Sequence, residues 1–182
     1  MPKARLDTHQ LHYEIHGDAD GTPLLLIVGL GGSSRGWQAL QVPEFSVQHR
    51  TVTFDHRGVG ESEDPGGAFS TADLADDTAR LLDVLGIARA HVLGAFMGGM
   101  VAQELALRHP GRVERLVLVG TYARPDAKRR MLLEKWKAMI EHGLPLELVA
   151  QERMLWTLSD ETLEQTDLID PMMQGFLRDR FP

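Results

Sequence analysis

The sequence lacks cysteine, long apolar runs and an excess of positive charge, and each absence narrows what the protein can be. Without cysteine there can be no disulfide framework and no thiolate zinc site, which fits a reducing compartment. The longest apolar run, residues 24–28, is far too short to cross a bilayer. No apolar signal peptide opens the chain, because charged residues follow Met1 closely. We therefore expect a cytoplasmic protein without membrane contact.

The chain has 182 residues, with 19 Lys and Arg against 26 Asp and Glu, which leaves a formal net charge of −7. This acidic balance provides no basic footprint for nucleic acid, which we do not expect as a partner. Hydrophobic residues make up 43% and charged residues 25%, as in globular proteins and unlike disordered, collagen-like or coiled-coil chains. The length favours one compact core.

Short apolar runs alternate with segments of helical periodicity, which predicts an α/β fold with a mostly parallel sheet and flanking helices. One helix is marked clearly, since Ser70 and Asp73 form a capping-box pattern at its start and Gly86 ends it. A second helix runs from a Gly-rich turn to Arg108. The expected strands are residues 11–16, 23–28, 51–55, 90–93 and 113–119.

The pattern changes after residue 121, where β-branched runs stop and Leu, Met and Trp recur at helical spacing. We expect an α/β core over residues 1–122 and a helical lid over residues 123–182, because a few short helices cannot readily bury their own apolar faces. The expected lid helices are one over residues 127–142 with Asp126 as its N-cap, one opened by Pro145, and two capped by Ser159 and by Asp170-Pro171.

The segment Gly94-Ala95-Phe96-Met97-Gly98 lies between a predicted strand and a predicted helix. Its glycines have the spacing of the nucleophile elbow G-x-S-x-G, but phenylalanine stands at the central position. With this segment the chain resembles the α/β-hydrolase fold superfamily, in particular its small ester and lactone hydrolases, including enol-lactone hydrolases. The resemblance is carried by four motifs between His12 and Tyr122: residues 26–33, residues 54–62, the elbow with Met97-Gly98-Gly99, and Arg108-His109-Pro110.

The resemblance implies a site that needs no cofactor and no metal. It implies that the backbone N–H groups of Met97 and Leu30 form an oxyanion hole, which requires no particular side chain. It also implies a small, apolar ligand of the ester or lactone type. The simpler alternative is that both Gly-rich turns are ordinary strand-to-helix connections. The substrate-binding residues that we expect are Gly29, Gly31, Phe96, Trp136 and Trp156.

Phe96 departs from the family pattern at the position where the chemistry is most demanding. Ester hydrolysis in this family needs a hydroxyl that attacks the carbonyl and a histidine that removes its proton, and a benzyl side chain supplies neither. The family's histidine follows strands that come after the lid, and no histidine of this sequence matches it. Ser33 and Ser34 offer hydroxyls near the oxyanion turn but have no base. We therefore expect a C-terminally truncated family member with absent or residual activity.

A retained elbow also has structural consequences. Phe96 should have a positive φ, and its ring should occupy the space of a substrate acyl group. The strand at residues 113–119 should be an unpaired sheet edge, which we expect to bind a second copy of the chain or a docked C-terminal fragment. Asp55 and Arg57 resemble a structural signature of the family, and we expect His56 between them to be exposed to solvent.

A second hypothesis is a binding module that captures a small ligand without converting it. In this hypothesis an apolar pocket is lined by aromatic and Met side chains, which are adaptable contacts for small molecules. The residues concerned are Phe96, Met97, Trp136 and Trp156.

A third hypothesis is a dinucleotide site, in which residues 29–32 cradle phosphates and Asp55 binds a ribose. The pattern is incomplete, because Ser34 replaces the third glycine and Pro43 interrupts the segment that should be the crossover helix. This hypothesis is the weakest of the three.

Overall fold

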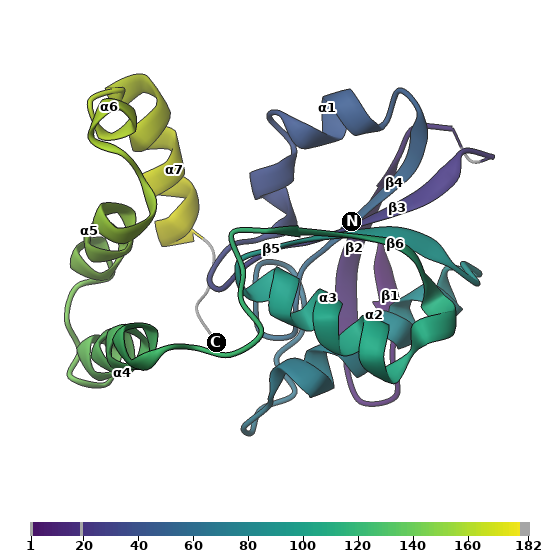
Figure 1. The fold of residues 1–182 in the computed structure, drawn as a ribbon, viewed down its shortest axis with the longest axis horizontal. Helices are drawn as coiled ribbons and strands as arrows, with labels where there is room; N and C mark the ends of the chain where they lie inside the picture. Colours follow the sequence, from purple (N-terminus) through teal and green to yellow (C-terminus); the bar gives the residue numbers. More distant parts are fainter. Residues whose placement is uncertain (1, 19, 179–182) are drawn as a thin grey trace. The chain divides into compact units, whose positions relative to one another are not determined.

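A computed structural model describes residues 2–18 and 20–178 of the chain (Figure 1). These residues form two compact units, which are divided in the sequence between Ala123 and Arg124. The first unit contains a six-stranded β-sheet with helices against both faces, and the second unit is helical. The predicted α/β fold with a mostly parallel sheet and flanking helices is confirmed.

The sheet contains the five predicted strands and one additional short strand at its start. The strands are β1 Lys3–Arg5, β2 Gln10–His16, β3 Thr22–Ile27, β4 His49–Phe54, β5 Ala90–Ala95 and β6 Val113–Val119. Their order across the sheet is β1-β2-β4-β3-β5-β6. The pairs β1–β2 and β2–β4 are antiparallel, whereas β4, β3, β5 and β6 run parallel, as expected for strands that are joined by helices.

The central strand β3 is buried on both faces of the sheet, which explains its unbroken apolar sequence. Leu25 and Ile27 belong to the main core, to which α2 and α3 contribute. Leu24 and Leu26 point to the opposite face and join a smaller core with η1 and α1. The helices are α2 Thr71–Val84 and α3 Met97–Arg108 on one face, and η1 Ser34–Trp37 and α1 Gln41–Phe45 on the other.

Helix α2 begins and ends where the sequence predicts. The Ser70 hydroxyl accepts a hydrogen bond from the Asp73 N–H at 3.3 Å, and the Asp73 carboxylate accepts one from the Ser70 N–H at 2.8 Å. Gly86 has a φ of +67° and follows the C-cap of the helix. Arg108, at the end of α3, donates to the Asp76 carboxylate at 2.7 Å, which fastens α3 to α2.

In the described part of the second unit there are four helices: α4 Ala127–Glu141, α5 Leu146–Thr157, α6 Asp160–Leu163 and α7 Thr166–Arg178. Asp126 and Ser159 are N-caps, as predicted. The predicted cap at Asp170-Pro171 is wrong, because these residues lie inside α7. The Ile169 N–H already bonds the Gln165 carbonyl, so the helix starts before the proline. Pro171 is the sixth residue of α7, so it lies beyond the first turn and removes one N–H donor from the helix.

Strand β6 forms an edge of the sheet, as predicted from the sequence. Its last four residues, Leu116 to Val119, are apolar and each is between 37% and 49% exposed. An exposed apolar edge is a template for pairing with another strand. Among the described residues, none of the helices has the length and apolar character that a membrane span requires.

Candidate active site

A sharp turn of the first unit lies at Phe96, between the last residue of β5 and the first residue of α3. Phe96 has φ +54° and ψ −117°, and within residues 2–18 and 20–178 it is the only residue other than glycine with a positive φ. The predicted positive φ is confirmed. This backbone region is sparsely populated, and for a residue with a Cβ atom it costs about 1–3 kcal/mol.

Two glycines let the backbone turn this sharply. A Cβ atom on Gly98 would collide with the carbonyl oxygen of Ile27 in β3, and one on Gly94 would collide with the carbonyl oxygen of Gly98. The first turn of α3 therefore lies directly against the ends of β3 and β5. The Phe96 N–H donates to the Val119 carbonyl at 2.9 Å, which ties the elbow to β6.

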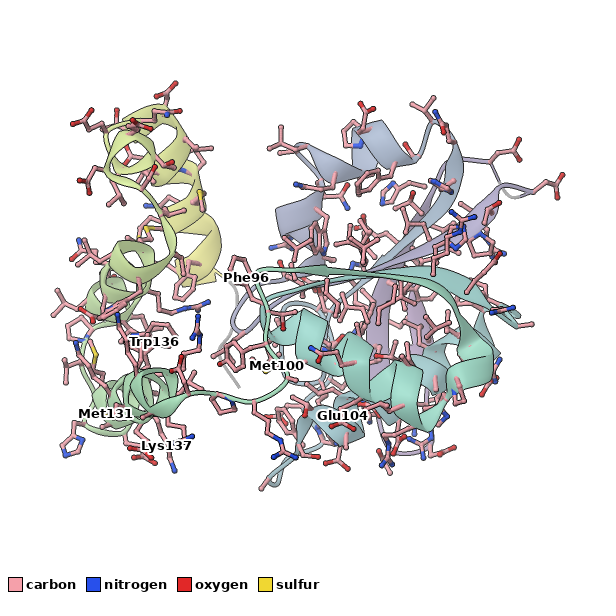
Figure 2. The ribbon with its side chains drawn as sticks, in the orientation of Figure 1. Phe96, Met100, Glu104, Met131, Trp136 and Lys137 are labelled. Carbon is pink, nitrogen blue, oxygen red and sulfur yellow. The ribbon has the colours of Figure 1, made fainter. Side chains whose placement is uncertain are left out.

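The Phe96 side chain projects from the end of β5 and is 53% exposed (Figure 2). Its Cβ lies 3.0 Å from the position of a Cβ built on Gly29, and its ring carbon Cε1 lies 3.1 Å from one built on Gly120. A side chain at either glycine would therefore crowd Phe96, and at Gly120 a φ of +57° favours glycine as well. Occupation of an acyl-group site by the ring stays a prediction.

Met97 and Leu30, the predicted oxyanion residues, lie on turns that follow neighbouring parallel strands. Met97 is the first residue of α3, so its N–H has no acceptor inside the helix. Leu30 lies in the turn after β3, which is closed by a hydrogen bond from the Gly32 N–H to the Gly29 carbonyl at 3.2 Å. Gly31 completes this turn with a φ of +65°. Because β3 pairs with β5, the two turns meet at the same edge of the sheet.

Asp55 is a buried structural residue that organises the loops beside this edge. Its carboxylate accepts hydrogen bonds from the Ser34 N–H at 2.7 Å and the Glu61 N–H at 3.0 Å. Both oxygens are thus occupied by the protein's own backbone. The dinucleotide hypothesis loses its ribose-binding acid for this reason.

His56 is buried, so the expectation that it is exposed to solvent is wrong. Its Nε2 lies 3.2 Å from the Val28 carbonyl oxygen, and its ring packs edge-on against Phe54. A carbonyl can only accept, so Nε2 carries the hydrogen of this bond. Burial lowers the pKa of His56 to about 4, partly offset by this hydrogen bond, and the ring is neutral at pH 7. His56 therefore holds the chain at the end of β3, just before the turn that contains Leu30.

Arg57 forms a largely buried ion pair with Asp77. Its Nε and Nη2 both donate to the Asp77 carboxylate at 2.7 Å, and Asp77 also lies 3.2 Å from His9 Nε2. This hydrogen-bonded pair raises the pKa of Arg57 above its ordinary value. The predicted structural role of Asp55 and Arg57 is consistent with these contacts.

In the part of the chain that the structure describes, none of the histidine contacts involves Phe96. The partners of these rings are Asp77 for His9, Glu14 for His12 and His16, His91 for His49, Val28 for His56, Asp76 for His109 and Ala138 for His142. Ser33 and Ser34 are both buried, and they are not paired with a base among the described residues. Within the same residues no cluster of three or more His, Asp or Glu side chains could hold a metal ion.

Trp136 and Trp156 belong to the second unit. Trp156 is 48% exposed, its indole N–H donates to Glu152 at 2.9 Å, and the Lys128 ammonium lies 4.6 Å above its ring. Trp136 is half-buried on α4, with the Arg153 guanidinium 5.7 Å from its ring centre (Figure 2). Their predicted role as substrate-binding residues stays a prediction.

A small cavity is lined in part by the two predicted oxyanion residues, and sequence reasoning missed most of its wall. His56, Val59, Phe69 and Leu74 come from separate segments, and no local pattern indicates that they meet. The cavity has a volume of about 40 Å³ and is lined by Gly29, Leu30, Gly31, His56, Arg57, Val59, Phe69, Leu74 and Met97.

The sequence model of one family, described as alpha/beta hydrolase fold, matches residues 22–178. The chain belongs to the α/β-hydrolase fold family. A protein named "Putative carbamate hydrolase RutD" from Azorhizobium caulinodans is 39% identical over 140 residues, which are 77% of this chain and 52% of that protein. This α/β-hydrolase chain thus spans about half the length of the curated relative.

Solved structures share the fold closely. A hydrolase from Pseudomonas aeruginosa PA01 aligns with a TM-score of 0.86 and 30% identity over 97% of this chain and 66% of the other. The enol-lactonase from Burkholderia xenovorans LB400 aligns with a TM-score of 0.85 and 28% identity over 97% of this chain and 71% of the other. The chain is therefore an α/β-hydrolase scaffold related to esterases and lactonases.

Proposed function

We propose that this chain binds a small ester or lactone through its carbonyl group and hydrolyses it slowly or not at all. One observation carries the proposal: the turn at Phe96 has the positive φ of a nucleophile elbow, while its tip carries a benzyl ring. The family and the related lactonase support ester or lactone chemistry for the scaffold. The side chain at position 96 argues against turnover, because a phenyl ring contains no nucleophilic atom.

The backbone of the elbow supports binding without turnover. The Met97 N–H lies at the N-terminus of α3, where the helix dipole favours an electron-rich oxygen. A backbone donor does not depend on the side chain at position 96, so carbonyl binding can persist when the nucleophile is absent. Leu30 lies in the neighbouring turn, and its N–H is the second donor that the family resemblance implies.

An activated-ester assay tests the absence of turnover. We expect the chain to hydrolyse p-nitrophenyl acetate no faster than its Phe96→Ala variant, which controls for reaction elsewhere on the surface. A Phe96→Ser variant joined to the C-terminal part of a longer relative gains a hydroxyl and a base, and its turnover should rise. Fast hydrolysis by the unmodified chain that disappears in Phe96→Ala would reject the proposal.

Capture of a ligand is the second candidate function, and the exposed ring of Phe96 favours it. A ligand that binds only the folded chain stabilises it by mass action, by about 2.7 kcal/mol at a concentration of 100 Kd. The measurement is the melting temperature with increasing γ-butyrolactone, followed by chromatography of the lactone. Stabilisation with intact lactone is the expected result, and recovery of the ring-opened acid contradicts it.

The exposed apolar edge of β6 supports a proposal about partners. We infer that a second copy of the chain adds a strand there, because four successive apolar residues are exposed on an unpaired edge. A separate docked C-terminal fragment is the competing occupant. The lid role of residues 123–182 and a cytoplasmic location stay predictions.

A further inference from the structure

The cavity behind the oxyanion turn adjoins both residues that the proposed function assigns to carbonyl binding. Leu30 and Met97 form part of its wall. Leu74 of α2, which is 2% exposed, and the half-buried Phe69 also line it. A group attached to a carbonyl at Met97 therefore has a small apolar space beside it.

Two ionisable residues line this cavity: the charge of Arg57 is compensated by Asp77, and His56 is uncharged at pH 7. The Arg57 guanidinium is bound by both oxygens of Asp77 and lies 5.7 Å from the Phe69 ring centre. His56 is neutral at pH 7, and its Nε2–H is used by the Val28 carbonyl. The remaining wall residues are glycine or apolar side chains. An apolar cavity of this kind holds hydrocarbon better than water.

The size of the cavity sets a limit on its occupant. A volume of about 40 Å³ has room for about three water-sized or methyl-sized groups. Leu74, one of its lining residues, is packed into the main core. Close-packed cores deform little, so the affinity should stop rising abruptly once the tail fills the cavity.

We propose that this cavity takes the short alkyl tail of the bound carbonyl compound, so that the site selects acyl groups with tails of about two or three carbons. The inference rests on the proposed function, because the carbonyl must lie at Met97 for its tail to enter. Val59, Phe69 and Leu74 are then the residues that determine specificity for chain length.

An NMR titration tests the inference on the chain as it exists. The probes are acetamide, propionamide, butyramide and hexanamide, which are uncharged and unreactive carbonyl compounds. We expect them to shift the backbone amide signals of Leu30 and Met97. The Kd should fall about fourfold for each methylene up to butyramide, as for burial of a CH₂ group, and should not fall further for hexanamide.

Two variants change the cavity in opposite directions. Leu74→Ala lengthens it, and hexanamide should then bind more tightly than butyramide. Val59→Ile shortens it without removing core contacts, and butyramide should lose its advantage over acetamide. Leu107→Ala is the matched control, because this α3 side chain is 79% exposed and should leave the series unchanged.

The outcomes separate the inference from the proposed function. Equal Kd values for all four amides, with shifts at Met97, would overturn the chain-length selection and leave the carbonyl site in place. No shift at Met97 with any amide would overturn the proposed function and the inference together. If butyramide loses its advantage over acetamide in Val59→Ile, this result supports the inference and the proposed function. It does so even when Leu74→Ala does not fold.

Discussion

Phe96 holds a backbone conformation that suits glycine and strains other residues. Alanine at this position keeps a Cβ atom and therefore keeps the strain, whereas glycine removes it. We expect Phe96→Gly to have a free energy of unfolding about 1–2 kcal/mol larger than Phe96→Ala, as measured in urea. Both variants lose the same ring, so the comparison isolates the effect of the backbone conformation on the free energy of unfolding.

The control for this comparison is Leu107, an exposed residue of α3 with ordinary helical geometry. There Leu107→Ala should be more stable than Leu107→Gly by about 1 kcal/mol, because glycine is a poor helix former. The preference for glycine should thus reverse between the two sites. An alanine preference at position 96 as well would mean that the elbow is not strained in solution.

His56 makes stability depend on pH, because burial holds its folded-state pKa near 4 while the unfolded chain titrates near 6.5. Between these values the unfolded state binds more protons than the folded state. The contribution of His56 is therefore complete above pH 6.5 and is lost as the pH falls to 4. We expect a loss of about 3 kcal/mol over this range.

Urea unfolding at several pH values measures this loss, with His56→Gln as the reference. Glutamine keeps an N–H donor for the Val28 carbonyl but does not titrate. The difference in unfolding free energy between the two proteins should shrink or reverse between pH 7 and pH 4. Parallel pH curves for both proteins would show that His56 titrates normally in the folded chain.

At the scale of elements, the join between β5 and α3 depends on close contact with β3. Gly98→Ala should lower the free energy of unfolding by about 1–3 kcal/mol or more, because the added methyl group meets the Ile27 carbonyl oxygen. Gly111→Ala is the control, since nothing lies within 4 Å of a Cβ built there. Thermal unfolding of both variants checks the prediction. Equal melting temperatures would contradict the close packing of the elbow.

The sequence predicts elements best where a local pattern decides them. The capping box at Ser70 and Asp73 and the unbroken apolar run of β3 each contain the information for their own structure. The start of α7 cannot be predicted in this way, because Pro171 indicates a helix boundary locally while the helix begins about one turn earlier. Short elements such as β1 are missed because their stability comes from pairing with β2.

The candidate site also contains features that the sequence predicts and features that it does not. The elbow with its positive φ is predictable, since a strand, a glycine pattern and a helix adjoin it in the sequence. The burial of His56 is not, because it depends on Phe54 and Val28 packing around the ring after the sheet has formed. Residues brought together from distant segments carry no shared local signal.

For the whole molecule, the exposed edge of β6 predicts self-association. Val117 is 49% exposed on this edge, and a lysine there should weaken pairing, as charged side chains do on natural edge strands. Sedimentation velocity over a range of concentrations should show dimers of the unmodified chain and a shift to monomers for Val117→Lys. Leu107→Lys serves as the control for added charge. A monomer at every concentration would refute the second-copy partner.

The pairing of β3 with β5 links the proposed carbonyl site to the folding of the chain. Leu30 and Met97 are distant in sequence, yet the turns that hold them grow from adjacent strands about 4.8 Å apart. Neither strand alone carries both donors of the proposed carbonyl site, so the proposal implies that a partly folded chain with only one of these strands in place cannot bind the ligand. If the proposal holds, affinity for a small carbonyl compound reports whether β3 and β5 have paired.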